Sequence, residues 1–351
     1  RIEMKKFLIA VLILTFICLF VASCTGYNIS LLDDDDSHDN PDDPPAVEDP
    51  PYTLSVVDPG TIDLGGNIDE PAPPPVKGED TKYYALNKSG FYEAGTTVDA
   101  INGLTGDVIR SFHLGFESAT MTGMRDESAL VFLDRDGSDD DINMAQLDGR
   151  ILGPLVELPT NVREEGKVHY ARNADIMVTA SEYEVYFTDL YSATVGDTWV
   201  LEEEDFEHCW LDATSDPNPY GDPTVYLLDA MGRAIHEYDT ATRALSPTPL
   251  ISGLTDSSVL GIDYDGNLYT GSDSPVLAII SAIDRIPMYM SIPEIHRTIA
   301  IEPAAENSVY LVYLTSDASK GGTVLERVWS DGTREEIFNI LDAPWVDFIP
   351  M

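Results

Sequence analysis

From Lys82 onwards, short runs of β-forming residues alternate with tight-turn pairs, and this alternation constrains the fold more than any other feature. Runs such as 131–133, 185–187, 225–228 and 309–313 consist of Val, Tyr, Phe and Leu, and runs of this kind favour strands. Asp-Gly, Asn-Gly and Thr-Gly pairs between the runs supply the positive φ angles that hairpin turns need. An all-β fold of about 270 residues is predicted, and a chain of this kind should first be tested for internal repeats.

Residues 118–159 give the clearest repeat. They predict strands at Ala129–Leu133 and Ile142–Leu147, separated by an Asp136-Gly137 turn and followed by an Asp148-Gly149 turn. A D-R-D-G turn, an isoleucine-led strand and a D-G turn in this order closely resemble the repeat of TolB-type β-propellers. The resemblance implies that each repeat folds as a four-stranded blade.

The other repeats are more diverged. Residues 261–272, GIDYDGNLYTGS, are similar to the D-x-D-G-N-L-Y signature of NHL-type and gluconolactonase-like propellers. Residues 103–112, GLTGDVIRSF, resemble the T-G turn of quinoprotein-type blades. Because unrelated activities share such folds, these resemblances imply the fold rather than the function.

The blade number follows from the spacing of the candidate innermost strands. They centre near residues 120, 170, 211, 262 and 300, and a mean step of about 45 residues gives six blades over 82–351, with five or seven as alternatives. The first repeat has no innermost strand of its own, whereas Trp345–Ile349 forms one at the end of the chain. We therefore predict an all-β, six-bladed β-propeller in which this last strand completes blade one and closes the ring.

The segment Met4–Cys24 has the layout of a secretory signal. Two lysines precede an uncharged apolar run, and Val21-Ala22-Ser23-Cys24 ends it with small residues and a cysteine. The segment resembles a bacterial lipoprotein signal, which implies removal of residues 1–23 and lipidation of Cys24. The alternative is an uncleaved anchor, for which the apolar run is short and lacks a positive flank on its far side.

The same resemblance implies a location at the bacterial cell envelope. Thr25 follows the acylated cysteine, where an aspartate favours inner-membrane retention in Gram-negative lipoproteins. The expected place is therefore the outer membrane, facing the periplasm, in a Gram-negative cell, and the cell surface in a Gram-positive one.

Residues 24–81 are rich in Asp and Pro. They contain Asp33-Asp34-Asp35-Asp36 and three proline clusters, with few aliphatic side chains to offset the entropy of ordering the chain. We predict a disordered acidic linker between the lipid anchor and the propeller domain at 82–351. Calcium binding by the aspartate run is the alternative to a solvated spacer.

The net charge of −42 restricts the partners. With 62 acidic and 20 basic residues, the chain is unsuited to nucleic acid, whose phosphates must be met by Lys and Arg. Anionic lipid headgroups would also repel it, so the lipid anchor has to hold the protein at the membrane. Such acidity favours a soluble monomer.

Cysteine use excludes an intramolecular disulfide in the processed chain. Of the three cysteines, Cys18 leaves with the signal and Cys24 is lipidated, so Cys209 remains alone. Cys209 lies between His208 and Trp210 and is either a nucleophile or a buried apolar thiol, of which the second is the more common arrangement.

The acidic turn at 134–141 is a candidate calcium site. Asp134, Asp136 and Asp140 could supply alternate oxygen ligands around Gly137. Aligned on that glycine, however, the twelfth position of an EF-hand-type loop is Asn143, which cannot act as the bidentate glutamate. A solvated hairpin turn is the competing interpretation.

Four acidic residues of the candidate innermost strands are expected near the axis: Asp212, Asp263, Glu302 and Asp347. In gluconolactonase-like propellers, carboxylate and amide side chains hold a metal in the central channel, and the resemblance extends this possibility to Asp263. Polar side chains that line the channel and hold only water are the alternative.

No catalytic residue is predicted. The chain has no G-x-S-x-G elbow, no phosphate-binding glycine loop, no H-x-x-x-H pair and no C-x-x-C pair. The main hypothesis is a non-catalytic binding or scaffolding module for an envelope protein or glycan. The rival is a metal-dependent lactonase, hydrolase or lyase with channel carboxylates, and a diverged propeller without a ligand is a third possibility. Calcium is the one cofactor left open.

Overall fold

The computed structural model describes residues 82–87, 96–103, 105–124, 129–134, 141–157, 166–190, 198–202, 208–317, 322–340 and 345–350. These residues belong to the second of two compact units, 58–351. The predicted signal, Cys24 and the predicted acidic linker lie outside them. Within these ranges the regular structure is all β-strand, and no helix is long and apolar enough to cross a membrane.

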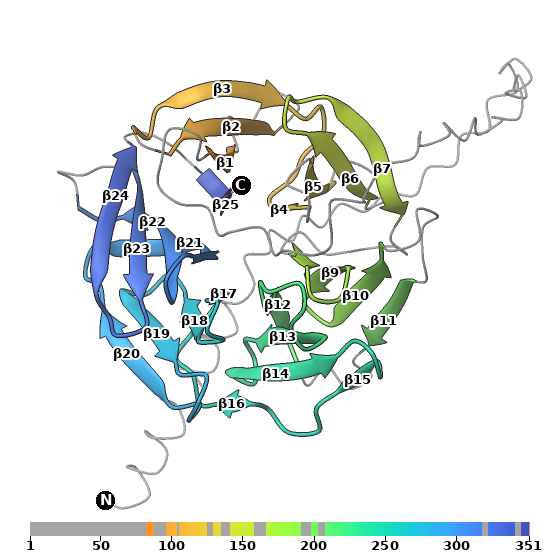
Figure 1. Ribbon diagram of the computed structural model, residues 1–351, viewed down its shortest axis with the longest axis vertical. Helices are drawn as coiled ribbons and strands as arrows, with labels where there is room; N and C mark the ends of the chain where they lie inside the picture. The colour runs from red at the N-terminus through yellow and green to blue at the C-terminus, as the bar shows by residue number, and fades with distance from the viewer. Residues whose placement is uncertain are drawn as a thin grey trace, which may run out of the picture. The chain divides into compact units, whose positions relative to one another are not determined.

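Six sheets are arranged in a ring, so the predicted six-bladed β-propeller is confirmed (Figure 1). From the axis outwards, blade 1 contains β25 (Trp345–Pro350), β1 (Lys82–Asn87), β2 (Thr97–Asn102) and β3 (Val108–His113). Blade 2 contains β4 (Met121–Gly123), β5 (Ala129–Leu133), β6 (Asp141–Gln146) and β7 (Ile151–Glu157). Blade 3 contains β8 (Lys167–Ala171), β9 (Ile176–Ser181), β10 (Glu184–Asp189) and β11 (Thr198–Glu202).

The second half of the ring repeats the plan. Blade 4 contains β12 (Trp210–Ser215), β13 (Thr224–Asp229), β14 (Ala234–Asp239) and β15 (Ala244–Leu245), and β16 (Ile251–Ser252) also pairs with β14. Blade 5 contains β17 (Val259–Ile262), β18 (Leu268–Gly271), β19 (Val276–Ile280) and β20 (Pro287–Ser291). Blade 6 contains β21 (Ile295–Ala304), β22 (Ser308–Thr315), β23 (Thr323–Trp329) and β24 (Arg334–Ile340).

The last strand closes the ring, as the sequence predicts. β25 pairs antiparallel with β1, with Tyr84 opposite Ile349 and Ala85 opposite Phe348. Blade 1 therefore combines the beginning and the end of the domain. This pairing covers the inner edge of β1, which would otherwise be open to another strand.

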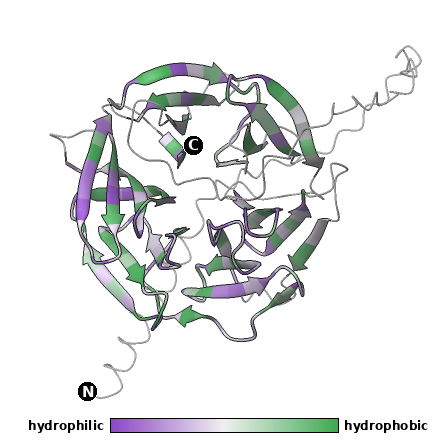
Figure 2. Ribbon diagram, in the orientation of Figure 1, coloured by the Kyte–Doolittle hydropathy of each residue, from purple (hydrophilic) through white to green (hydrophobic). Residues whose placement is uncertain are grey.

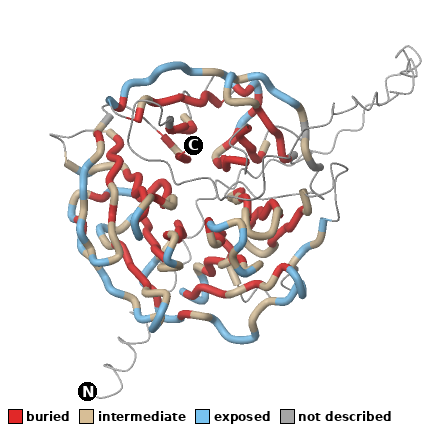
Figure 3. Tube along the Cα trace, in the orientation of Figure 1, coloured by how far each residue is buried: buried red, intermediate tan, exposed pale blue. Residues whose placement is uncertain are grey.

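The core lies between neighbouring blades. Side chains of the middle strands interdigitate there; Phe187 of blade 3, for example, stacks on Tyr238 of blade 4 with ring centroids 4.1 Å apart. Figure 3 shows the inner strands buried, and β5 is buried along its whole length, whereas β3 on the rim is mostly exposed. Figure 2 shows apolar and polar residues mixed along the outer strands. This difference arises because the inner strands pack against other strands on both faces, whereas the strands at the rim pack on fewer faces.

The hairpin turns lie at the predicted glycines in most blades. Gly149 and Gly332 adopt φ angles of 90° and 87°, in the left-handed region that glycine enters without steric cost. At Met231-Gly232 the left-handed residue is instead Arg233, with a φ of 49°. Gly232 serves another purpose there, because it makes room for the side chain of Asp229.

Candidate functional site

The innermost strands run in the same direction, and side chains link several of them to the next. Thr120 Oγ1 accepts a hydrogen bond from the backbone N–H of Val168 at 3.1 Å, and Thr122 Oγ1 accepts one from Tyr170 at 3.2 Å. Because the two links join residues in the same order along the innermost strands of blades 2 and 3, these strands run parallel. We call the side of the ring where these strands begin the start face, and the side where they finish the end face.

Two of the acidic residues near the axis make the same kind of link. Asp347 accepts the backbone N–H of Met121 at 2.7 Å, which joins blade 1 to blade 2. Asp212 accepts the N–H of Leu260 at 2.9 Å, which joins blade 4 to blade 5. An innermost strand has one unpaired edge, and a buried N–H without a partner is costly. These carboxylates therefore have a structural use.

Lys167, Asp212, Glu302 and Asp347 line one cavity at the axis, and we call them the axial cluster. The Nζ atom of Lys167 lies 3.3 Å from Asp212 Oδ2, in an ion pair of which both side chains are largely buried. The cavity has a volume of about 30 Å³. Since a buried water needs roughly 10–15 Å³ by the same kind of measure, the cavity has room for a few waters at most.

Burial and mutual repulsion set the protonation of the axial cluster. Burial raises the pKa of Glu302 to about 8, with Asp347 and Asp212 adding to the effect. Burial also raises the pKa of Asp347 to about 6, against the opposing attraction of Lys167. For Lys167 burial lowers the pKa, but Asp212 and Asp347 outweigh it and the net pKa is above the usual value. Near pH 7, Lys167 is therefore an ammonium and Glu302 is mostly a carboxylic acid.

A second cavity, of about 50 Å³, opens where the innermost strands finish, and we call it the end-face pocket. Arg172, Tyr264 and Pro217 line it, and Glu302 and His169 border both cavities. Burial, with a smaller effect of Arg172, lowers the pKa of His169 to about 4, so this imidazole is neutral at physiological pH. Its Nε2 atom lies 3.0 Å from Ser215 Oγ.

The predicted site residues do not form one site. Asp212, Glu302 and Asp347 meet at the axial cavity. Asp134 lies at the end of β5, where it accepts a hydrogen bond from Asn143 Nδ2 at 2.8 Å. Asp136 and Asp140 lie outside the described residues.

Asp263 lines neither of these cavities, and its side chain is fully buried. It follows β17 and accepts hydrogen bonds from the backbone N–H groups of Asp265 and Asn267, both at 2.9 Å. Asn267 Nδ2 and the Tyr269 hydroxyl donate to its other oxygen at 2.8 and 3.0 Å. An aspartate that enters a tight turn commonly bonds backbone groups two to four residues on, and here this satisfies the carboxylate inside the blade.

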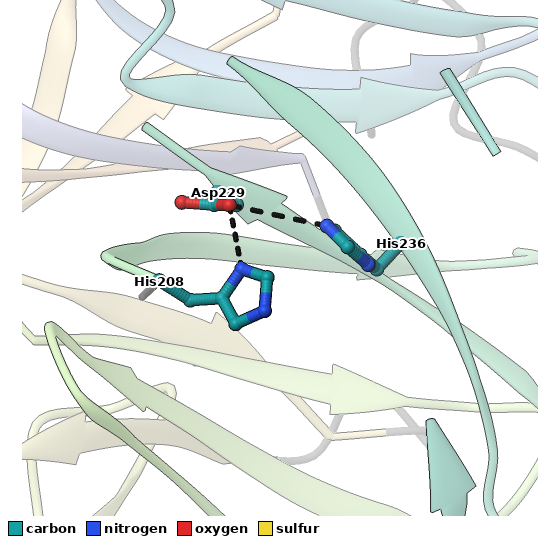
Figure 4. Close-up of side chains that lie close together, drawn as sticks. All are labelled: His208, Asp229 and His236. Carbon is teal, nitrogen blue, oxygen red and sulfur yellow. Dashed lines mark hydrogen bonds and ion pairs between the residues drawn. The ribbon is translucent and has the colours of Figure 1, made fainter. Parts of the chain in front are cut away.

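A further group of polar side chains was not anticipated from the sequence. His208, Asp229 and His236, which we call the blade-4 triad, bring their ligand-type atoms within 4.8 Å of one another (Figure 4). His208 precedes β12, Asp229 ends β13 and His236 lies near the beginning of β14. Because β12 and β14 run in one direction and β13 in the other, all three lie toward the start face. Their spacing along the chain does not indicate that they meet; the antiparallel register of β12, β13 and β14 would have to be predicted first.

Cys209, the predicted lone cysteine, lies beside the triad, is partly buried and forms no disulfide in the described part of the chain. Its backbone N–H donates to Asp229 Oδ1 at 3.0 Å.

No known protein family and no curated protein matches this sequence. Solved structures do match the fold. A catalytically inactive virginiamycin B lyase from Staphylococcus aureus, solved with quinupristin, is 13% identical, with a TM-score of 0.50 over 66% of this chain and 72% of that one. A Lactobacillus plantarum protein is 13% identical, with a TM-score of 0.50 over 74% and 82%. A Bacteroides caccae protein of unknown function is 12% identical, with a TM-score of 0.53 over 77% and 99%. At these identities the similarities support the β-propeller fold and no activity.

Proposed function

We propose that this chain is a lipid-anchored, extracytoplasmic β-propeller that acts as a non-catalytic binding module for an envelope protein or glycan. The observation that carries the proposal is the contrast between the two cavities on the axis. The inner one is lined by the protein's own ammonium and carboxylates, whereas the end-face pocket also presents the large polar side chains of Arg172 and Tyr264.

The end-face pocket has the chemistry of a recognition surface. Arg172 and Tyr264 line it, and Tyr220, on the neighbouring loop between β12 and β13, is 53% exposed. Arginine and tyrosine are enriched among the residues that dominate binding energy, because each combines a large flat surface with hydrogen-bond donors. A guanidinium is also attractive to carboxylates on a protein or an acidic glycan.

The binding test compares variants of the full chain expressed in a bacterial envelope. After crosslinking, we expect the wild type to recover a partner and Arg172→Ala/Tyr264→Ala to recover at least tenfold less. The control is Arg233→Ala, which removes an arginine from an exposed ion pair with Asp256 on the start face. Equal recovery by the double variant, or no partner above an unanchored control, would count against the proposal.

The membrane anchor is tested separately. Cys24→Ala removes the sulfur that would carry the lipid, so the protein should move from the membrane fraction to the soluble extracytoplasmic fraction. Retention of this variant in the membrane would favour an uncleaved anchor.

The second candidate is a propeller-fold hydrolase, lactonase or lyase, and one observation favours it. Glu302, with a pKa of about 8, borders both cavities and is a suitable general acid near neutral pH. The metal-dependent version is disfavoured because the Lys167 ammonium lies among the carboxylates that would bind the metal. Elemental analysis and a thermal shift with millimolar calcium test that version: bound metal or clear stabilisation that Glu302→Gln abolishes would support it.

A further inference from the structure

The blade-4 triad contains the donor set of a transition-metal site. Two imidazoles and one carboxylate suit zinc and neighbouring divalent metals, whereas calcium prefers oxygen ligands alone. Among the described residues, these two histidines are the basic side chains near Asp229, and both face its Oδ2 atom. The triad therefore differs from the axial cluster, where a lysine already supplies the positive charge.

The distances are close to those of a shared metal ion. His208 Nδ1 lies 2.7 Å and His236 Nε2 lies 3.9 Å from Asp229 Oδ2. Ligand atoms about 2.1 Å from a tetrahedral zinc ion are separated by roughly 3.4 Å. The first distance must open by about 0.7 Å and the second close by about 0.5 Å. The imidazole nitrogens of the two histidines, which lie within 4.8 Å of each other, must also approach to roughly 3.4 Å, so binding requires rotation of the histidine side chains.

The carboxylate of Asp229 is oriented by its second oxygen. Oδ1 accepts the backbone N–H groups of Cys209 and Gly232, both at 3.0 Å, and this leaves Oδ2 directed at the imidazoles. A Cβ atom at residue 232 would collide with Oδ2, so the glycine creates the space that the carboxylate occupies. Outer hydrogen bonds of this kind hold metal-binding carboxylates in place.

The histidine rings are held by packing and not by hydrogen bonds alone. The Trp210 ring stacks on His208 with centroids 4.8 Å apart, and it meets His236 edge to face at 5.4 Å. His236 Nδ1 is buried without a hydrogen-bond partner in the described part of the chain, and its Nε2 is too far from Asp229 for a hydrogen bond. Nε2, which faces Asp229 Oδ2 without a hydrogen bond to it, is therefore available as a metal ligand.

We propose that His208, Asp229 and His236 bind one divalent transition-metal ion, with Zn²⁺ the best match to this donor set. The His208 side chain is 22% exposed, so solvent can reach the site and supply the fourth ligand. The ion would join the segment before β12 to β13 and β14 and so fasten blade 4 at the start face. This role is independent of the proposed binding function at the end face.

The test uses the full chain, purified without a polyhistidine tag, stripped with a chelator and titrated with Zn²⁺. We expect one equivalent to bind and the melting temperature to rise. Removing a ligand in His208→Gln or His236→Gln should weaken binding at least 100-fold and abolish the rise. The matched control is His296→Gln, which changes an exposed histidine outside the triad and should bind zinc as the wild type does.

A spectroscopic measurement separates metal binding from loss of folding. Co²⁺ in place of Zn²⁺ should give visible absorption typical of nitrogen and oxygen ligands in the wild type and in His296→Gln, and none in a His208→Gln/His236→Gln variant with unchanged circular dichroism. Gly232→Ala should also weaken zinc binding, since the added methyl group displaces Asp229 Oδ2. Equal zinc binding by the wild type and the double variant, or no binding by the wild type, would overturn the proposal.

Discussion

The axial cluster and the blade-4 triad are both buried groups of ionisable side chains in one ring, yet their chemistry differs. In the axial cluster, Asp212 and Asp347 each accept a backbone N–H of the next blade with one oxygen and the N–H of the following residue with the other, and Lys167 supplies a counter-charge. In the triad, only one oxygen of Asp229 is engaged by the backbone, and the other faces two imidazoles.

The comparison teaches that the number of carboxylates is a poor guide to a functional site. At the axis, Asp212 and Asp347 join neighbouring blades and Lys167 supplies a counter-charge, so little capacity to bind a ligand remains. A single carboxylate in blade 4 leaves more, since its side-chain partners are imidazoles, which are metal ligands themselves. The partners of the carboxylate oxygens, not the number of acidic residues, distinguish the two places.

The largest expected effect comes from removing the counter-charge of the axial cluster. Lys167→Met should lower the free energy of unfolding by about 3 kcal/mol at pH 8, because it leaves buried carboxylates unpaired. The loss should be smaller at pH 5, where Glu302 and Asp347 are protonated. Urea denaturation at the two pH values measures both numbers.

The control for that change is Arg233→Met, which breaks an exposed ion pair with Asp256 and should cost less than about 1 kcal/mol. If Lys167→Met costs no more than this control at pH 8, Lys167 does not neutralise the cluster.

An intermediate effect is expected from an uncharged link between blades. Thr120→Val keeps the shape of the side chain but leaves the buried N–H of Val168 without its acceptor, at a cost of about 2 kcal/mol. Unlike the loss in Lys167→Met, this one should be the same at pH 5 and pH 8. Thr105→Val, at an exposed turn position, is the comparison and should change stability by less than about 0.5 kcal/mol. A strong pH dependence of the stability loss in Thr120→Val would show that the hydrogen-bond links between blades depend on the charges of the axial cluster.

A gain in stability, rather than a loss, is expected from a change at Glu302. Its folded-state pKa is raised to about 8, so the folded protein binds this proton more tightly than the unfolded chain does. The contribution of Glu302 to stability is therefore fully present in mild acid and is lost as the pH rises through about 8. Glu302→Gln removes this loss and should therefore be more stable than the wild type at pH 9.

The change in stability between pH 5 and pH 9 is measured for the wild type and for Glu302→Gln, with Glu335→Gln, on the exposed outer strand β24, as the control. Parallel stability curves for the wild type and Glu302→Gln would refute the assigned protonation of the axial cluster.

Much of the fold could be predicted because its determinants are local. The strand at Ala129–Leu133 and the turn at Asp148-Gly149 follow from β-propensity and from the left-handed turn residue, and the structure has both. The position of Trp345 and its neighbours as the missing innermost strand follows from counting repeats, and the pairing of β25 with β1 confirms it.

The candidate site was less predictable because side-chain direction is not local. Asp212, Glu302 and Asp347 lie on innermost strands and reach the axis, but Asp263 lies one residue beyond β17, where the backbone turns and engages its carboxylate. The triad is assembled from residues as far apart as His208 and His236, and only the antiparallel register of β12 to β14 brings them together.

The pairing of Tyr83 with Pro350 places the two ends of the propeller side by side. A short linker between them, with a new opening cut in a surface loop of another blade, should give a permuted protein with the same six sheets. In such a protein, blade 1 would be continuous and a different blade would depend on the final residues to be translated. Any difference in refolding rate between the permuted and natural orders would then report how much the closing step limits assembly.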